Sequence, residues 1–351
     1  QYSRAEVATH NTKEDCWIII HNFVYDVSKW IDSHPGGYLP LVNVAGGDAT
    51  DNFLSYHPVH VWDRKLPYFQ VGQLTEEDSN VSSFVSEYRG LQQQFLKAGM
   101  YQTRMFYYVK LMAWVVTLFA AMLYFTVFCT STAAHMFGAV LLGFFFQQIA
   151  FIGHDLGHNG VSHVNAIDSA LGLVFGNVLT GISMGWWKWS HNTHHNVCNS
   201  VQHDPDVQYL PIFAPGDEFL ESDFKSTFHQ RVFSIDAVAR ALIRFQHYLF
   251  YPVMGVARFN LYVQSILFII KTKVPTVNKA LEWGGLAVFY TWLGALLCTL
   301  PTLQQSLAFL FLSHATSAIL HVQIVLSHFP MTKFHGYPMQ GTNSDSWFVL
   351  Q

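Results

Sequence analysis

Two long stretches of the chain contain no Asp, Glu, Lys or Arg, and they dominate its hydropathy pattern. The first covers residues 111–153 (43 residues) and the second covers residues 284–332 (49 residues). A helix that crosses the bilayer needs about 20 apolar residues, so each stretch is long enough for two spans joined by a tight turn. The first turn is expected near Thr130 to Thr132 and the second at Pro301. The pattern therefore predicts two transmembrane hairpins, about four spans, rather than buried hairpins in a large soluble core.

The segment from Arg240 to Ile270 is apolar but interrupted by charge. It is rich in Phe and Tyr, yet Arg240, Arg244 and Arg258 recur along it. This mixture favours an amphipathic helix at the membrane interface over a fifth span. Two hairpins leave all long hydrophilic segments on one side of the membrane, and basic residues near the span ends mark that side as cytosolic. These residues are Arg104, Lys110, Lys271, Lys273 and Lys279.

The first eighty residues have a mixed pattern of short elements. Strands are predicted at residues 16–20 and 23–27, and helices at residues 38–45 and 48–56. His34 and His57 lie in loops beside these helices, with apolar residues between them. Two imidazoles that face each other across an apolar slot suit a six-coordinate haem iron. The alternatives are that His34 supports a Pro-Gly-Gly turn and His57 is a surface residue, or that His60 is the second ligand.

Composition and charge narrow the class of protein. Hydrophobic residues make up 51 % of the chain and charged residues only 12 %, which makes an ordinary soluble enzyme a poor match. Residues 1–78 hold 11 acidic and 5 basic residues, a net charge of −6, and the whole chain has a net charge of −4, which argues against nucleic acid as a partner. The four cysteines form no CxxC pair, so neither a disulfide framework nor a zinc ribbon is indicated.

Histidine is as frequent as Lys and Arg together, with 19 of each, and five histidines form two short motifs. The first histidine box is His154 and His158; the second is His191, His194 and His195. Residues three or four apart share one face of a helix, so each box can direct several imidazoles toward one metal. Nitrogen donors suit iron, zinc, copper or nickel, and five or more ligands support two ions with an open position for oxygen. Spacing alone does not choose the metal.

Further polar residues lie beside the boxes. Asp155 is expected to orient a box histidine, because a metal-bound imidazole usually donates its other N–H to a carboxylate. His163 is a further candidate for the same task. His314 and His321 fall inside the last span, where hydrogen bonds between helices are expected. Five others (His135, His203, His229, His247 and His335) are interpreted as interfacial or surface residues.

Residues 1 to about 75 resemble the cytochrome b5 family. The motifs that carry the resemblance are Trp17, Val24-Tyr25-Asp26-Val27, His34-Pro35-Gly36-Gly37 and Ala49-Thr50-Asp51 with His57-Pro58. The resemblance implies that His34 and His57 bind haem b. The acidic surface of this part fits docking to a basic electron donor, since complementary charge steers association.

Nearly the whole chain resembles the membrane-bound fatty acid desaturases, and more narrowly the front-end desaturases with an N-terminal cytochrome b5 domain. The carrying motifs are His154-Asp155-Leu156-Gly157-His158, Trp186-Trp187, His191-Asn192-Thr193-His194-His195 and Asp204-Pro205-Asp206. The resemblance implies a diiron centre held by the five box histidines, oxygen as the co-substrate, and a lipid acyl chain as the substrate. It also implies an endoplasmic reticulum membrane protein with four spans, and with its haem domain and boxes in the cytosol.

The expected fold is an α+β haem domain (residues 1–78), a linker with a pre-membrane helix (79–110) and an all-α membrane domain (111–351). The family's third box, commonly Gln-x-x-His-His, is missing after Pro330. We therefore expect the chain to be a C-terminally truncated fragment whose diiron site is incomplete. His328 resembles the family's Ser-His element after the last span and is expected near the metal.

The expected reaction is oxygen-dependent desaturation of a long acyl chain. Electrons enter from a donor such as an NADH-dependent cytochrome b5 reductase, reach the haem, and then pass to the iron held by the boxes. Two alternatives remain: a hydroxylase of lipids or sphingoid bases with the same fusion, and a non-enzymatic membrane electron carrier. The position of the double bond, the chain length and the acyl carrier are left open by the residues.

Overall fold

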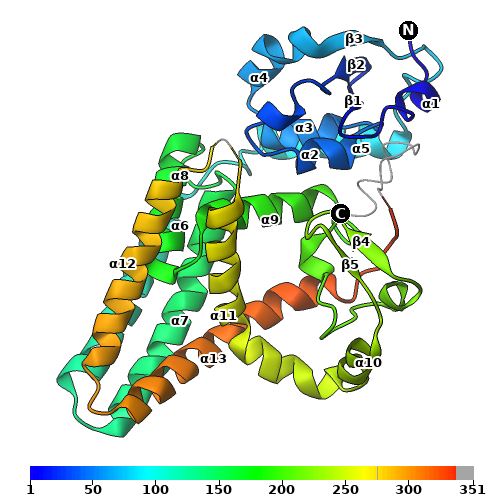
Figure 1. The fold of residues 1–351 in the computed structure, drawn as a ribbon. Helices are drawn as coiled ribbons and strands as arrows, with labels where there is room; N and C mark the ends of the chain where they lie inside the picture. Colours follow the sequence, from blue (N-terminus) through cyan, green and yellow to red (C-terminus); the bar gives the residue numbers. More distant parts are fainter. Residues whose placement is uncertain (275, 337–351) are drawn as a thin grey trace.

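The computed structural model describes residues 1–274 and 276–336. Figure 1 shows a small N-terminal domain of short elements that sits beyond one end of a set of long helices. A separate lobe, which contains β4, β5 and α10, lies beside those helices. The helix α5 (Ser83–Lys97) follows the N-terminal domain and leads toward the long helices.

The N-terminal domain is built on a three-stranded antiparallel sheet in the order β1-β2-β3. Its strands are β1 (Trp17–Ile20), β2 (Phe23–Asp26) and β3 (Gln70–Gln73). Its helices are α1 (Arg4–Val7), α2 (Leu39–Val44), α3 (Thr50–Tyr56) and α4 (Val59–Arg64), with 3-10 turns η1 (Ile31–Ser33) and η2 (Leu66–Phe69). The predicted strands and the helices α2 and α3 are confirmed. Neither β3 nor α4 was predicted, because both are short and mostly polar or exposed.

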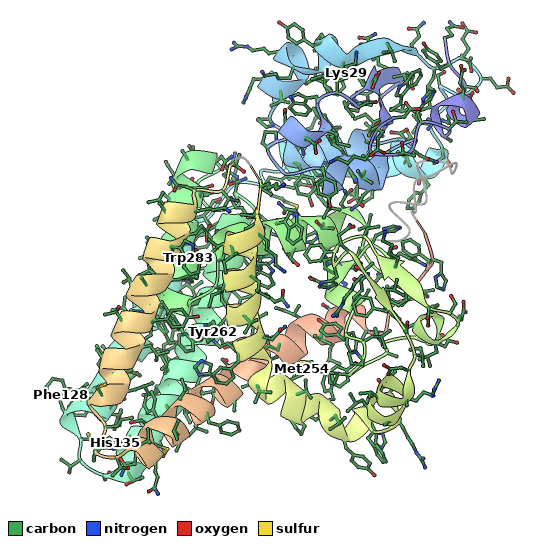
Figure 2. All side chains as sticks on the ribbon, viewed as in Figure 1. Lys29, Phe128, His135, Met254, Tyr262 and Trp283 are labelled. Carbon is green, nitrogen blue, oxygen red and sulfur yellow. The ribbon has the colours of Figure 1, made fainter. Side chains whose placement is uncertain are left out.

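Two hairpins of long helices match the two uncharged stretches. The long helices are α6 (Met105–Leu123, continued by the π-helical η3, Tyr124–Phe128), α7 (Thr132–Gly157), α11 (Gln246–Lys271), α12 (Lys279–Cys298) and α13 (Leu303–His328). The turns after η3 and after α12 lie at the end far from the N-terminal domain, where Figure 2 labels Phe128 and His135. His135 is 2 % exposed there and bonds Gln305 and the Cys129 carbonyl, so it is not a surface residue, although its place beside the hairpin turn agrees with an interfacial one.

Five of the described helices, rather than four, are long and apolar enough to cross a membrane. The additional one is α11, in the segment for which we expected an interfacial helix. The Arg258 side chain is 1 % exposed, and its guanidinium lies 4.0 Å from the centre of the Phe146 ring and donates to Tyr262 Oη. Its charge therefore lies inside the helical bundle. Arg240 and Arg244 belong to a separate short helix, α10 (Ala237–Arg244).

The helix α9 (Met184–Asn196) lies across the ends of the long helices, between them and the N-terminal domain (Figure 1). It follows α8 (Asn165–Gly172) and the π-helical η4 (Leu173–Val178). After α9 come the 3-10 turns η5 (Pro205–Val207) and η6 (Asp217–Leu220) and the hairpin of β4 (Phe224–Ser226) and β5 (Arg231–Phe233). The described protein thus places one short helix at the junction of all its parts.

Two contacts fix the position of α9. Gly157, at the end of α7, leaves room for the Trp187 ring, because a Cβ at Gly157 would overlap that ring. The buried Glu282 side chain accepts from the backbone N–H of Gly185 (2.9 Å) and from Asn177 (2.6 Å). Each oxygen of this buried carboxylate therefore accepts a hydrogen bond, as buried polar atoms usually do. Together, the glycine and the carboxylate hold the N-terminal half of α9 against α7 and α12.

Candidate functional site

His34 and His57 face each other in the N-terminal domain. His34 follows η1, His57 follows α3, and their ring centroids are 6.0 Å apart. Burial lowers the pKa of both imidazoles, so both are neutral near pH 7. His60 lies on α4 with its side chain exposed, so the structure pairs His34 with His57 and not with His60.

Each of these rings is held in one orientation by its Nδ1 atom. His34 Nδ1 lies 2.7 Å from the Gly37 carbonyl oxygen, and His57 Nδ1 lies 3.0 Å from that of Phe53. A carbonyl only accepts, so each Nδ1 carries the proton and each Nε2 keeps its lone pair for a metal. Aromatic rings flank both imidazoles: Phe53 stacks on His57, and Trp30 meets His34 edge-on. This donor pair fits a haem iron with one imidazole on each face.

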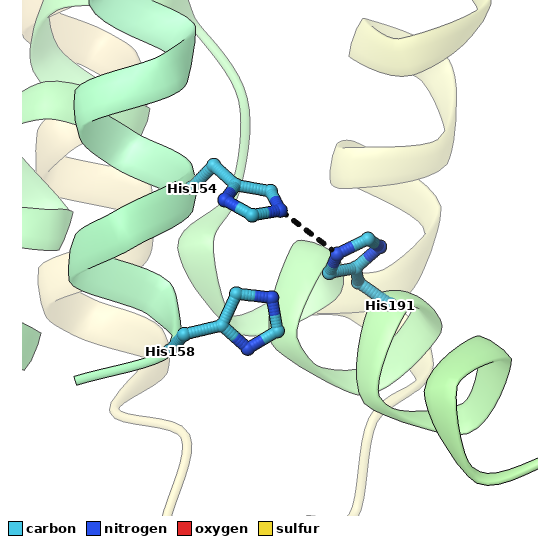
Figure 3. A group of neighbouring side chains, drawn as sticks. All are labelled: His154, His158 and His191. Carbon is cyan, nitrogen blue, oxygen red and sulfur yellow. Dashed lines mark hydrogen bonds between the residues drawn. The ribbon is translucent and has the colours of Figure 1, made fainter. Parts of the chain in front are cut away.

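The first histidine box and the second meet at the C-terminal end of α7. Figure 3 shows His154, His158 and His191 turned toward one another. His154 Nε2 lies 3.2 Å from His191 Nε2, which in turn lies 3.1 Å from His195 Nε2. Two nitrogens bound to one ion at about 2.0–2.1 Å are themselves about 3 Å apart when they lie at right angles. The His158 Nε2 atom is buried and has no hydrogen-bond partner within the described ranges. These atoms could therefore share a metal ion.

A second group of donors lies beside the first, with the His194 ring centroid 5.7 Å from that of His191. It consists of His194, Cys198 and His328, whose ligand atoms lie within 4.8 Å of one another. The Cys198 Sγ atom is 3.6 Å from His328 Nδ1 and 3.9 Å from His194 Nε2. His328 thus lies beside a box histidine, and its expected proximity to the metal stays a prediction. Cys198 was missed, because a single cysteine three residues after a histidine motif carries no recognised spacing.

Carboxylates orient the box histidines. His194 Nδ1 donates to Asp204 at 2.9 Å, and Asp206 lies 3.6 Å from His191 Nδ1. Asp155 lies 3.3 Å from His154 Nδ1 and accepts from Tyr108 Oη at 2.8 Å. Carboxylates in this position leave Nε2 free for a metal. The contact expected for Asp155 is present; those of Asp204 and Asp206 were signalled only by the Asp-Pro-Asp motif.

Burial and the neighbouring charges set the protonation of the box histidines. Burial and the neighbouring His191 lower the pKa of His158 to about 3, and burial and His191 likewise lower that of His195 to about 3. Burial also acts to lower the pKa of His194, but Asp204 and Asp206 outweigh it and raise that pKa well above its usual value. His158 and His195 are therefore neutral imidazoles, while His194 pairs with the negative charge of Asp204 and Asp206. Neutral nitrogen donors next to buried carboxylates suit a cation.

The remaining histidines are distributed as follows. His314 Nε2 lies 3.0 Å from Tyr262 Oη, which confirms the expected bond between helices. His203 is 5 % exposed and lies 2.8 Å from Thr227 Oγ1, so the interpretation of this residue as a surface or interfacial one is wrong. His163 is exposed and contacts Thr103 rather than a box histidine. The donors described above are thus concentrated in two places, the haem slot and the ends of α7, α9 and α13.

Two family models match the chain. Residues 3–75 match the "Cytochrome b5-like Heme/Steroid binding domain", and residues 130–350 match "Fatty acid desaturase". A Delta(8)-fatty-acid desaturase 2 of Arabidopsis thaliana is 42 % identical over 99 % of this chain and 75 % of its own length. The chain belongs to the fatty acid desaturase family. It carries the cytochrome b5-like domain at its N-terminus, as expected.

Two further relatives support this membership. A Delta(8)-fatty-acid desaturase of Helianthus annuus is 38 % identical over 99 % of this chain and 74 % of its own length. A Delta 8-(E)-sphingolipid desaturase of Emericella nidulans is 30 % identical over 90 % of this chain and 75 % of its own length. The desaturase is therefore an oxidoreductase and a multi-pass membrane protein that acts on a lipid, with the b5 fusion of the front-end group. The hydroxylase and electron-carrier alternatives are not favoured.

Proposed function

We propose that this desaturase introduces a double bond at the eighth carbon of a long lipid chain. The proposal is supported by the names of its relatives, which include both fatty-acid and sphingolipid desaturases of this position. The observation that carries it is the meeting of the two histidine boxes at one end of the membrane helices, with His154 Nε2 and His191 Nε2 3.2 Å apart.

In this proposal His34 and His57 hold haem b, and two iron ions are held by the boxes. His154, His158 and His191 supply one group of nitrogens and His194 supplies another, with His195 between them. His328 is assigned to the group of His194, whose ring centroid is 4.3 Å away. The family's third box stays a prediction that lies outside the described residues.

The bound irons would supply the oxygen chemistry that removes two hydrogens from adjacent methylenes. The protein's part is to hold and orient the ligands. Asp204 keeps the His194 proton on Nδ1, and the Tyr108 hydroxyl holds the Asp155 carboxylate beside His154. Trp187 covers the other side of the first group: its ring centroid is 4.4 Å from that of His191 and 5.4 Å from that of His158. An apolar wall of this kind excludes water from reactive oxidants.

The division into a haem domain (1–78), a linker (79–110) and a membrane domain (111–351) is part of the proposal, as are the endoplasmic reticulum and the cytosolic side for the boxes. Glycosylation tags inserted after Thr130 and after Pro301 should then be modified, and a tag after Glu221 should not. These sites lie in the two hairpin turns and in the lobe beside the bundle. Modification after Glu221 would overturn the orientation.

The electron donor in this proposal is an NADH-dependent cytochrome b5 reductase. Residues 1–78 carry a net charge of −6 from 11 acidic and 5 basic residues. Long-range attraction to a basic partner accelerates encounter and weakens with salt. Reduction of the haem by such an enzyme should therefore slow as salt is added; a rate independent of salt would count against steering by this surface.

Product analysis tests the proposed reaction. The full-length protein is expressed in a yeast host without a desaturase of this position, and fatty acids and sphingoid bases are both profiled by mass spectrometry. We expect a new double bond at the eighth carbon in one of the two lipid classes, absent with the His191→Ala variant. A hydroxylated product, or a double bond elsewhere along the chain, would refute the proposal.

A further inference from the structure

The N-terminal domain touches the helix that carries the second histidine box. The Asn52 side chain, on α3, donates to the Asn196 side chain at the end of α9, and both residues are buried. The Asn196 amide in turn donates to the Pro40 carbonyl at 3.0 Å, at the start of α2. Asn196 directly follows His195, so this pair of bonds joins the haem domain to the box itself.

A second contact lies at the loop that contains His34. Thr276 Oγ1 donates to the Pro35 carbonyl at 2.8 Å. Gly37 lies against the membrane domain: a Cβ there would be 3.4 Å from Val274 Cγ2 and 4.0 Å from the Trp189 indole. Gly37 also has a φ of +82°, which glycine adopts at least cost. A Cβ would fit at this distance, so the positive φ, not the space, is what favours glycine in the ligand loop beside α9.

Both proposed haem ligands are connected to this interface by short steps. His34 Nδ1 donates to the carbonyl of Gly37, the residue that faces Trp189. The His57 ring stacks on Phe53 at 4.3 Å between centroids, and Phe53 adjoins Asn52. His34 is therefore one hydrogen bond away from an interface residue, Gly37. His57 is one ring contact away from Phe53, the neighbour in sequence of Asn52.

On the other side of the interface, α9 leads to the metal ligands within a few residues. Trp189 lies two positions before His191, and Asn196 lies one position after His195. The Trp189 ring packs against the Phe228 ring, with the ring centroids 4.1 Å apart. The contact residues are thus part of the same rigid helix as the second histidine box.

We propose that Asn52, Asn196 and Thr276 are positioning residues that dock the haem domain on α9, so that electrons cross directly within one chain. This inference rests on the proposed haem and iron sites. Each transfer moves one electron: ferrous haem is oxidised to the ferric form, ferric box iron is reduced to the ferrous form, and no bond or proton is exchanged. Electron transfer slows steeply as the gap widens, so the docked contact sets the rate.

The chemistry of the interface gives the docked state a distinctive property. Its hydrogen bonds join neutral amides, a hydroxyl and carbonyls. No ion pair joins the two faces in the part of the chain that the structure describes. Salt screens charged groups, so internal electron transfer is insensitive to ionic strength, unlike reduction by a steered external donor.

The first test of docking measures the distance between the haem domain and the membrane domain. Nitroxide labels are placed at Tyr68→Cys (83 % exposed) and Met331→Cys (53 % exposed) in the full-length protein, with the native Cys129 and Cys298 changed to Ser. Pulsed electron paramagnetic resonance in lipid nanodiscs should give one narrow distribution of distances between the two labels, at low and at high salt. A broad distribution in the otherwise unaltered protein would overturn the proposal.

The docking variant is Asn52→Leu with Thr276→Val, which removes one donor from each contact. The conservative variant, Asn52→Gln with Thr276→Ser, keeps both donors. The matched control, Asn80→Leu with Thr9→Val, alters exposed residues whose side chains bond the nearby carbonyls of Glu77 and Glu6. We expect a broadened distribution in the docking variant alone, with an unchanged haem spectrum that shows the haem domain is folded.

Electron transfer is then followed as reoxidation of the reduced haem after mixing with oxygen. We expect it to slow about tenfold or more in the docking variant, since small misplacements have effects of this size, and to recover in the conservative variant. An unchanged rate in the docking variant would overturn the inference. If the His191→Ala variant reoxidises its haem as fast as the unaltered protein does, the proposed iron site is wrong instead. The distance measurement then still decides whether the domains dock.

Discussion

His194 Nδ1 lies 2.9 Å from a carboxylate oxygen of Asp204, ten residues further along the chain, and both side chains are at most 1 % exposed. The same carboxylate accepts from the backbone N–H groups of Asn199 and Asp206. The loop after α9 is thus folded around one aspartate, which fixes the orientation of one box imidazole. A buried carboxylate is stable there because each of its donors is supplied locally.

Replacing Asp204 with Asn should weaken metal binding without unfolding the loop. The amide keeps the shape of the side chain but loses the charge that favours His194 as a ligand. Loss of such a carboxylate typically lowers the affinity for the metal about 10–100-fold. Non-haem iron bound at limiting iron concentration measures the effect. The control is Asp223→Asn, an exposed carboxylate that bonds Ser234; equal iron in both variants would contradict the assignment.

His57→Ala should abolish the low-spin spectrum of a haem with two histidine ligands. His57 Nε2 is the only lone pair that faces His34 within the slot as described, because His57 Nδ1 is engaged by Phe53. His60→Ala is the matched control, since the exposed His60 side chain is three residues away on α4. A bis-histidine spectrum that survives in His57→Ala and disappears in His60→Ala would reverse the choice of ligand.

Haem retention should decline as the pH falls below about 6.5, the usual pKa of histidine. Burial lowers the pKa of His34 and His57 in the folded domain. Below pH 6.5 the unfolded chain therefore binds protons that the folded pocket excludes, and stability falls with pH. The slope is at most about 1.4 kcal/mol per pH unit for each histidine. Haem release in urea, followed at pH 8, 7, 6 and 5, should show no change between 8 and 7 and a falling midpoint below; a rising midpoint would contradict this sign.

Gly157→Ala should separate the two histidine boxes. The added Cβ would overlap the Trp187 ring, so α9 must move or the ring must turn. Overpacking of this kind typically costs about 1–3 kcal/mol. Thermal unfolding in nanodiscs should show the loss, and bound iron should fall with it. Gly153→Ala, one turn earlier on α7, meets only Met184 Cε at 4.0 Å and should behave like the unaltered protein; equal losses in both would show that Gly157 has no special role.

Much of the fold follows from local patterns in the sequence. The two uncharged runs predict the two hairpins, because each run is long enough for two spans. This length is read from the sequence without knowledge of any tertiary contact. The strands around Ile18 and Tyr25, and the loops that carry His34 and His57, follow from alternation and turn residues. The box histidines follow from helical spacing. Each of these features depends on residues that are close in sequence.

The features that were missed depend on contacts between distant segments. Arg258 suggested an interfacial helix, but Phe146 and Tyr262 enclose its charge inside the bundle. Cys198 becomes a neighbour of His328 only when α13 packs beside α9, 130 residues away in sequence. Asn52 meets Asn196 across 144 residues. Such contacts leave no periodic trace, so composition and spacing alone do not reveal them.

The most direct test of the account is the ratio of non-haem iron to haem in the purified full-length protein. We expect a ratio near two, because the boxes hold two irons while His34 and His57 hold one haem. In His191→Ala the ratio should fall toward zero with the haem spectrum intact, since the two sites share no ligand. Haem iron alone in the unaltered protein, or a His191→Ala variant that keeps its non-haem iron, would contradict the account.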